Sequence, residues 1–135
     1  MGLILDTGVF IRMERGLKVD FSVWADYGEA FISTVTVSEL LVGVHRANNA
    51  TRRARRLAYV EGVLSRVAAL PFTTEVARVH AELMASLMQS GQVSGAHDLL
   101  IAATAVYHGC AVLTADAGDF DRMPGLQVLI LSSVE

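Results

Sequence analysis

Short runs of wholly apolar residues alternate along this chain with segments of helical periodicity, and this alternation restricts the possible fold strongly. Residues 2–5, 30–32, 111–113 and 128–131 contain no polar side chain. Runs of this kind are typical of parallel strands that are covered by helices on both faces. The sequence therefore predicts an α/β protein.

The segments between these strands carry their apolar residues at the spacing of one helix face. Apolar residues recur at intervals of three and four over 37–44, 57–67, 76–87 and 99–106. The chain has 135 residues and no internal repeat. We therefore expect residues 1–135 to form a single domain, a three-layer α/β/α sandwich with a short, mostly parallel central sheet.

Turn and capping residues separate these elements. A very short strand is expected at 69–72, after which Thr73 or Thr74 is placed to cap the next helix. Gly91 is placed to end that helix, and Ser94 to cap the following one.

Composition excludes several classes of protein. The only cysteine, Cys110, lies in an apolar run, so a disulfide within one chain is impossible and a buried thiol is expected. No apolar run approaches the ~20 residues that a membrane span needs, and the first residues lack the pattern of a signal peptide. We therefore expect a cytoplasmic protein with no membrane partner.

The net charge of −3 means that binding to nucleic acid needs a local basic cluster. The chain offers one, and it opens a predicted helix, where cations oppose the helix dipole. A solvated helix face is the simpler interpretation, and contact with RNA phosphates is the functional one. The cluster consists of Arg46, Arg52, Arg53, Arg55 and Arg56.

Carboxylates follow the ends of three predicted strands or lie near the start of a predicted helix. Asp6 ends the first strand, Glu39 follows the second, Asp98 enters an apolar helix, and Asp116 and Asp119 follow the strand at 111–113. In a parallel sheet these positions meet at one edge, where open α/β sheets hold their ligands. Clustered carboxylates repel unless they lie apart or a divalent cation sits between them.

Most of these acidic residues also have a simpler interpretation when taken alone. Asp6 could cap the helix that follows it. Thr36-x-x-Glu39 has the form of a capping box, and Asp116 and Asp119 suit a turn. Asp98 differs, because a carboxylate in such an apolar helix is costly unless it is paired or bound to a metal. The coincidence of all these placements at one edge favours a metal site.

Taken together, these motifs resemble those of the PIN-domain nucleases, and in particular of the VapC toxins of bacterial toxin–antitoxin pairs. The resemblance runs in order through Leu5-Asp6-Thr7, Thr36-x-x-Glu39-Leu40, His97-Asp98 and Leu113-Thr114-x-Asp116-x-x-Asp119-Phe120. One departure is Gly8, where the family more often carries Asn or Ser.

The resemblance implies a ribonuclease that hydrolyses RNA phosphodiester bonds with Mg²⁺ or Mn²⁺, acting as the toxin of a VapBC-type pair. It also implies two partners, a VapB-like antitoxin whose helix fills an apolar groove and, as a homodimer, a second copy of the chain. Two alternatives stay open: a PIN-fold nuclease outside a toxin pair, and a catalytically impaired module that binds RNA or protein. The implied catalytic residues are Asp6, Glu39, Asp98, Asp116 and Asp119, with Asp6, Asp98 and Asp116 as metal ligands and Thr7, Ser33 and Thr114 as the side chains that orient them.

Overall fold

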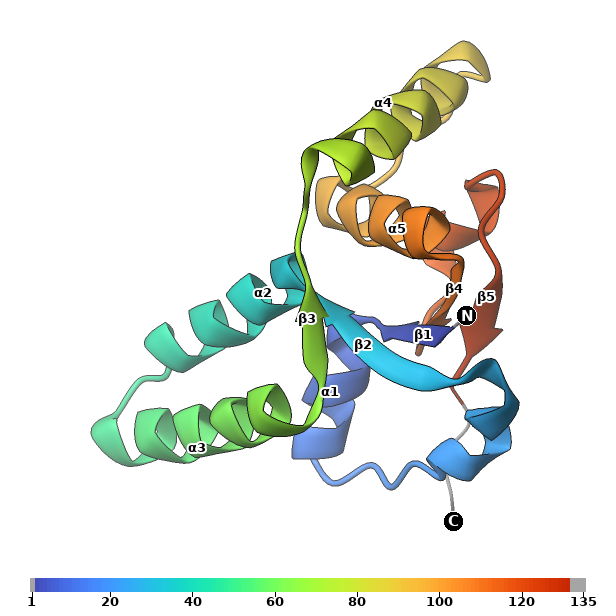
Figure 1. Cartoon of the computed structure of the whole chain (residues 1–135). Coiled ribbons are helices and arrows are strands. Elements are labelled where there is room, and N and C mark those ends of the chain that lie inside the picture. The colour runs from blue at the N-terminus through green and yellow to red at the C-terminus, as the bar shows by residue number, and fades with distance from the viewer. Residues whose placement is uncertain (1, 132–135) are drawn as a thin grey trace.

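The computed structural model describes residues 2–131, which form one five-stranded sheet with helices on both faces (Figure 1). The strand order is β3-β2-β1-β4-β5, and every neighbouring pair is parallel. This confirms the α/β sandwich that the sequence predicts. The strands are β1 (Gly2–Leu5), β2 (Glu29–Ser33), β3 (Ala68–Leu70), β4 (Cys110–Thr114) and β5 (Val128–Ile130).

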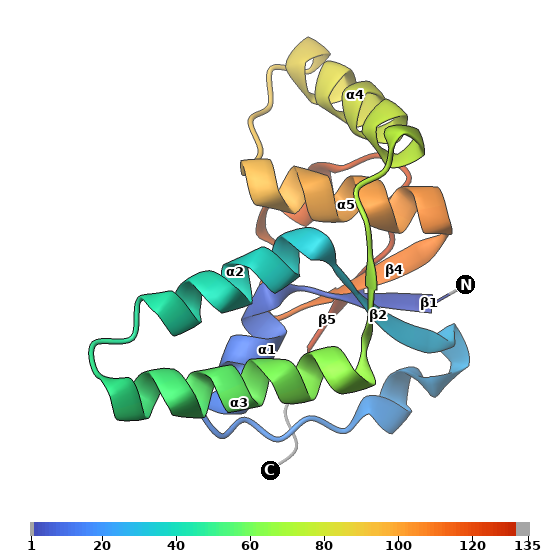
Figure 2. The same ribbon diagram turned by 60° about the vertical axis from the view of Figure 1, so that its left-hand side comes forward.

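Two groups of helices cover the two faces of the sheet (Figures 1 and 2). Helices α4 and α5 pack on one face through a core that includes Ile4 and Val112. Helices α1, α2 and α3 cover the other face, where Leu5 and Leu113 are buried. The helices are α1 (Thr7–Glu14), α2 (Thr34–His45), α3 (Ala50–Arg66), α4 (Thr74–Gln89) and α5 (Ala96–His108), with short 3-10 helices η1 (Phe21–Tyr27) and η2 (Gly118–Arg122).

At the starts of α2, α4 and α5, the structure confirms one predicted cap and corrects two others. Thr73 caps α4, its hydroxyl accepting from the Val76 N–H at 3.2 Å. The prediction for Ser94 is wrong, because Gly95 is the N-cap of α5 and supplies no side chain. The capping box is also wrong: the Ser33 hydroxyl caps α2 by accepting from the Val35 N–H at 3.1 Å, which leaves Glu39 free for other contacts.

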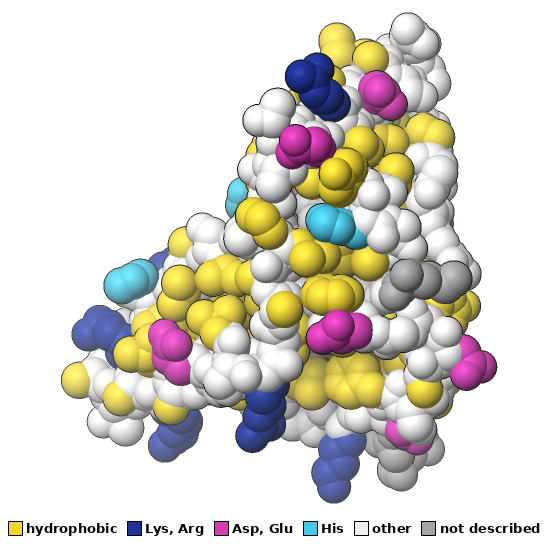
Figure 3. Space-filling view, viewed as in Figure 1, with side chains coloured by type: hydrophobic (Ala, Val, Ile, Leu, Met, Phe, Trp, Pro, Cys, Tyr) yellow, Lys and Arg dark blue, Asp and Glu magenta, His cyan; other side chains and the backbone are white. Residues whose placement is uncertain are grey.

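The surface seen in Figure 3 carries a band of hydrophobic side chains across its middle, and Lys and Arg side chains project mostly from its left and lower margin. Within residues 2–131 no helix is both long and apolar enough to cross a membrane.

Candidate active site

The site begins where β1 and β4 end side by side. The backbone N–H of Asp6 donates to the Leu113 carbonyl at 3.0 Å, which fixes the two strand ends together. The Asp6 carboxylate accepts from the Thr7 N–H at 2.8 Å and from the Thr114 hydroxyl at 2.9 Å. Asp6 therefore caps α1, as predicted, while Thr114 holds its second oxygen.

Burial raises the pKa of Asp6, although the hydrogen bonds from Thr114 and Thr7 lower it. The negative charges of Glu39 and Asp116 raise it further. The carboxylates of Asp6, Glu39 and Asp116 are therefore close enough at this edge of the sheet for their charges to interact.

Glu39 reaches the same edge from α2 and is held by two residues from other elements. Its Oε1 accepts from the Thr7 hydroxyl at 2.8 Å, and its Oε2 lies 3.2 Å from Nδ1 of His97. The Thr7 hydroxyl also lies 3.0 Å from the hydroxyl of Thr36, which is fully buried. Thr7 has one hydroxyl proton and the carboxylate is the stronger acceptor, so Thr36 donates to Thr7 and Thr7 donates to Glu39.

Asp98 lies in the first turn of α5 and is partly buried. Burial is the main cause that raises its pKa to about 6, and the charges of Asp6, Asp119 and Glu39 add to it. His97 lowers the pKa in part. A carboxyl group whose pKa is raised by burial and by neighbouring anions marks a concentration of negative charge.

Asp116 and Asp119 differ in how their carboxylates are engaged. Asp116 is exposed, and its Oδ1 accepts from the Gly118 N–H at 3.1 Å. Asp119 uses both oxygens: Oδ2 accepts from the Gly95 N–H at 2.7 Å, and Oδ1 accepts from Nη2 of Arg122 at 2.9 Å. Asp116 is thus the freer of the two carboxylates.

The structure assigns the orienting side chains somewhat differently from the sequence. Thr7 and Thr114 do donate to carboxylates. Ser33 does not among the described residues, because its hydroxyl caps α2. Sequence reasoning gave Thr36 a capping role, whereas its hydroxyl contacts that of Thr7. It missed Arg122, although Arg122 lies three residues after its partner Asp119, the spacing that brings side chains together on one helical turn.

The donor chemistry of this edge suits a hard divalent cation. Oxygen ligands from carboxylates are those that Mg²⁺ and Mn²⁺ prefer. Burial and, after it, neighbouring negative charges raise the pKa values of Asp6 and Asp98, and a dication would favour their ionised forms. In this conformation no three acidic, histidine or cysteine side chains within residues 2–131 converge closely enough to hold an ion. Binding of an ion by these carboxylates would therefore need side-chain rotation.

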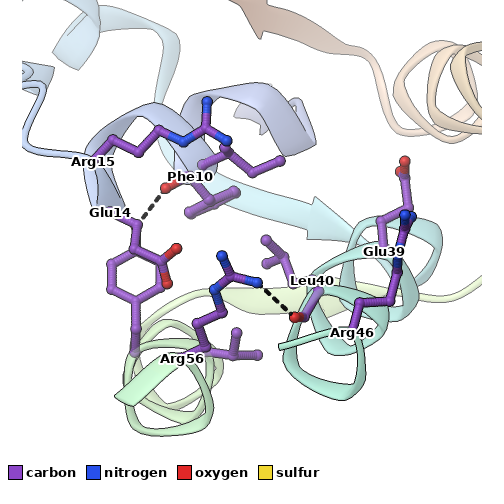
Figure 4. Close-up of a pocket in the computed structure, with 11 residues that line it drawn as sticks. Phe10, Glu14, Arg15, Glu39, Leu40, Arg46 and Arg56 are labelled. Carbon is purple, nitrogen blue, oxygen red and sulfur yellow. Dashed lines mark hydrogen bonds between the residues drawn. The ribbon is translucent and has the colours of Figure 1, made fainter. Parts of the chain in front are cut away.

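A groove of about 380 Å³ leads away from Glu39 between α1, α2 and α3 (Figure 4). Apolar side chains such as Phe10 and Leu40 line it. Arg15 and Arg46, which directly follow α1 and α2, and Arg56 of α3 supply positive charge. Two of the predicted phosphate-binding arginines, Arg46 and Arg56, therefore share a groove with a carboxylate of the site.

The remaining arginines of the cluster lie along the start of α3, and part of the cluster has a structural role. Arg53 donates to the Ala47 carbonyl at 3.1 Å and Arg56 to the Gly43 carbonyl at 3.0 Å, so both bind the C-terminal end of α2. Arg52 and Arg55 are exposed, and together with Arg56 they line a further pocket of about 380 Å³. Arg52 donates to the Asn48 Oδ1 at 3.2 Å, and neither guanidinium binds α2, so both can reach a ligand.

A third, more apolar pocket of about 490 Å³ lies between α1, η1 and α3. Its walls include Phe10 and Tyr59, which also line the groove beside Glu39, so the two hollows adjoin. Gly62, within α3, leaves one wall open, because nothing lies within 4 Å of the position where its Cβ would be.

The chain is thus a parallel α/β sandwich with four acidic segments at the carboxyl edge of its sheet. This is the edge at which proteins of this class bind their ligands. Residues 3–126 match the family described as PIN domain. The chain belongs to the PIN-domain family.

Relatives and solved structures agree with this assignment. The chain is 45% identical over 133 residues to Ribonuclease VapC1 of Rickettsia felis, and the match covers 98% of each chain. It superposes with a TM-score of 0.79 and 32% identity on a structure of VapBC-5, a member of the VapBC family of toxin-antitoxin systems, from Mycobacterium tuberculosis, covering 96% of this chain and 99% of the other. VapBC2 from Rickettsia felis, bound to a DNA fragment from its promoter, shares the fold at a TM-score of 0.82 and 22% identity, with 98% and 100% covered.

Proposed function

We propose that this protein is a cytoplasmic ribonuclease that depends on Mg²⁺ or Mn²⁺ and acts as the toxin of a VapBC-type pair, with residues 1–135 as one nuclease domain. The observation that carries the proposal is the acidic edge of the sheet, where burial and then the negative charge of Glu39 raise the pKa of both Asp6 and Asp98. The name of the VapC1 relative and the toxin–antitoxin structures support the substrate class and the partner.

Asp6, Asp98 and Asp116 would hold the metal. A bound divalent ion supplies Lewis-acid chemistry, lowering the pKa of an attacking water and stabilising charge on the phosphate. Thr114 keeps the Asp6 carboxylate at the strand end, and the Thr36–Thr7 pair keeps Glu39 on the same side of the site. The Asp98 carboxyl must lose its proton to bind a cation. Its pKa of about 6 is below neutral pH, so the carboxyl is mostly ionised there.

The RNA strand would reach this edge along the groove that Arg15, Arg46 and Arg56 line. Their positive charge suits the phosphates that flank the cleaved bond. The adjoining apolar pocket would take the apolar face of an antitoxin helix, which is one of the usual ways in which peptides are recognised.

Gly8 does not argue against activity. A Cβ at this position would meet only the Asp6 Oδ2, at 4.0 Å. Gly8 therefore leaves room beside Asp6 and does not disturb the hydrogen bonds that Asp6 makes to Thr7 and Thr114.

Mapping of RNA ends in cells tests the proposal. The unmodified chain and the matched variant Asp98→Asn would each be expressed from an inducible promoter. New RNA 5′ ends would be sequenced after induction. We expect new ends with the unmodified chain only, and their suppression when a VapB-like antitoxin that binds the chain is co-expressed. No new ends, although the chain is folded by circular dichroism, would overturn the proposal in favour of a binding module. Equal cleavage with Asp98→Asn would overturn the assignment of Asp98 to the metal.

A further inference from the structure

We infer that Arg122 is a positioning residue of the active site: together with Asp119 it clamps the loop before α5 and so fixes Asp98. In this account Asp119 acts through the clamp and is not a metal ligand. The inference rests on the proposed function, because it assigns Asp98 to the metal.

Three hydrogen bonds form the clamp. The Asp119 Oδ2 accepts from the Gly95 N–H at 2.7 Å, and Arg122 donates to the Asp119 Oδ1 through Nη2 at 2.9 Å. The other terminal nitrogen of Arg122, Nη1, donates to the Val93 carbonyl at 3.0 Å. One guanidinium thus joins η2 to the loop both directly and through Asp119, in the two-pronged geometry that Arg provides and Lys does not.

The start of α5 needs such a tie because its N-cap supplies no side-chain hydrogen bond. Gly95 is the N-cap of α5 and has no side chain with which to cap the helix. The Ser94 hydroxyl is buried and has no hydrogen-bond partner among the described residues. The Asp119 carboxylate instead places its charge at the N-terminus of α5, where the helix dipole favours an anion.

Asp98 lies only three residues beyond the clamped Gly95, in the first turn of α5. A Cβ at position 95 would lie 3.4 Å from the Asp119 Oδ2 and 3.7 Å from the Asp98 Oδ2. The clamp and the Asp98 carboxylate therefore meet around one glycine, and a displacement of the loop would move Asp98 directly.

The clamp differs from the alternative, in which Asp119 is a fourth metal ligand, in the direction in which Arg122→Gln changes Mn²⁺ affinity. By charge alone, Arg122→Gln removes a cation and should strengthen Mn²⁺ binding, whereas Asp119→Asn removes an anion and should weaken it. The clamp predicts that both variants weaken Mn²⁺ binding, by about the 10–100-fold typical of groups that orient ligands. It also predicts that the double variant is no weaker than either single variant, since both remove one device.

Binding would be measured on the full chain by electron paramagnetic resonance of free Mn²⁺, without RNA. Amide hydrogen exchange of Gly95, followed by NMR, reports the loop independently and should accelerate in both variants. Arg122→Lys, which can keep one bond but not two, should restore part of the affinity. Matched controls are Asp121→Asn, an exposed carboxylate of the same 3-10 helix, and Arg78→Gln on α4.

An exposed ion pair contributes little to global stability, so the melting temperatures should change little while Mn²⁺ affinity falls. Opposite effects of Arg122→Gln and Asp119→Asn on Mn²⁺ affinity, or additive losses in the double variant, would overturn the clamp. Unchanged affinity in Arg122→Gln would do the same. Failure of the proposed function would be seen separately, as an absence of Mn²⁺ binding or RNA cleavage in the unmodified chain.

Discussion

Burial and the charges of three other carboxylates act together on Asp98. Replacing its carboxyl group should therefore abolish catalysis without lowering the stability of the fold. Its pKa in the folded chain is about 6, above the ordinary value of 3.8, so the folded state binds this proton more tightly than the unfolded state. Ionised Asp98 therefore destabilises the fold, and this penalty is present above pH 6 and disappears as the pH falls towards 3.8.

We accordingly predict that Asp98→Asn abolishes cleavage yet melts at a higher temperature than the unmodified chain at pH 7.5 in EDTA. The difference should shrink as the pH falls from 6 towards 3.8 and vanish below 3.8, where the carboxyl becomes protonated in both states. Thermal melts of both chains across this pH range check it. A large drop in the melting temperature of Asp98→Asn at pH 7.5 would show that Asp98 has a structural partner instead.

Asp116 should matter more for turnover than Asp119. Asp116 uses one oxygen in a local turn, whereas Asp119 uses both in the clamp. Loss of a direct ligand should exceed the ~10–100-fold typical of outer groups, so Asp116→Asn should lose more than about 100-fold in cleavage rate. Asp119→Asn should stay within that range. Rates across a Mg²⁺ titration compare the two, and a larger loss in Asp119→Asn that excess metal does not restore would reverse their roles.

At the scale of helices and strands, the cluster at the start of α3 divides into structural and available arginines. Arg52→Gln combined with Arg55→Gln should weaken RNA binding and reduce the slope of log affinity against log salt by about 0.7 for each lost phosphate contact. Arg53 is left in place because it binds the end of α2. Arg78→Gln is the control, and a slope unchanged in the double variant would make the cluster a solvated surface.

Gly62 offers a test of the stability of α3 in the chain without partners. Glycine within a helix destabilises it by ~0.5–1 kcal/mol relative to alanine, and nothing lies within 4 Å of its Cβ position. Gly62→Ala should therefore raise the free energy of unfolding by about that amount, measured by urea denaturation. A lower value would mean that α3 needs glycine at this point.

Apolar runs and helical periodicity predicted every strand and the helices α2 to α5 because both report burial, which is a local property of the sequence. The prediction of capping residues fared worse. Ser33, Ser94 and Thr36 are all chemically able to cap, and only the packed geometry decides which hydroxyl faces which N–H. Thr36 was assigned to a cap and is instead buried against Thr7.

For the molecule as a whole, the parallel order of the strands made the convergence of the site residues predictable from the sequence. Parallel strands β1 and β4 are neighbours, so residues separated by 108 positions, Asp6 and Thr114, form a hydrogen bond. The convergence of acidic segments followed from this general property of parallel sheets. The Arg122 contacts did not, because they depend on the path of the loop before α5, which no periodicity encodes.

The central claim is that this acidic edge hydrolyses RNA with a divalent ion. The most direct test is the rate of cleavage of a labelled RNA by the purified chain, in Mg²⁺ or Mn²⁺ and in excess EDTA, with Asp98→Asn purified in parallel. We predict cleavage only with the metal, restored when metal is added back, and none by Asp98→Asn under any condition. Equal cleavage in EDTA by the unmodified chain, with Asp98→Asn inactive so that a contaminating nuclease is excluded, would contradict the metal-dependent mechanism.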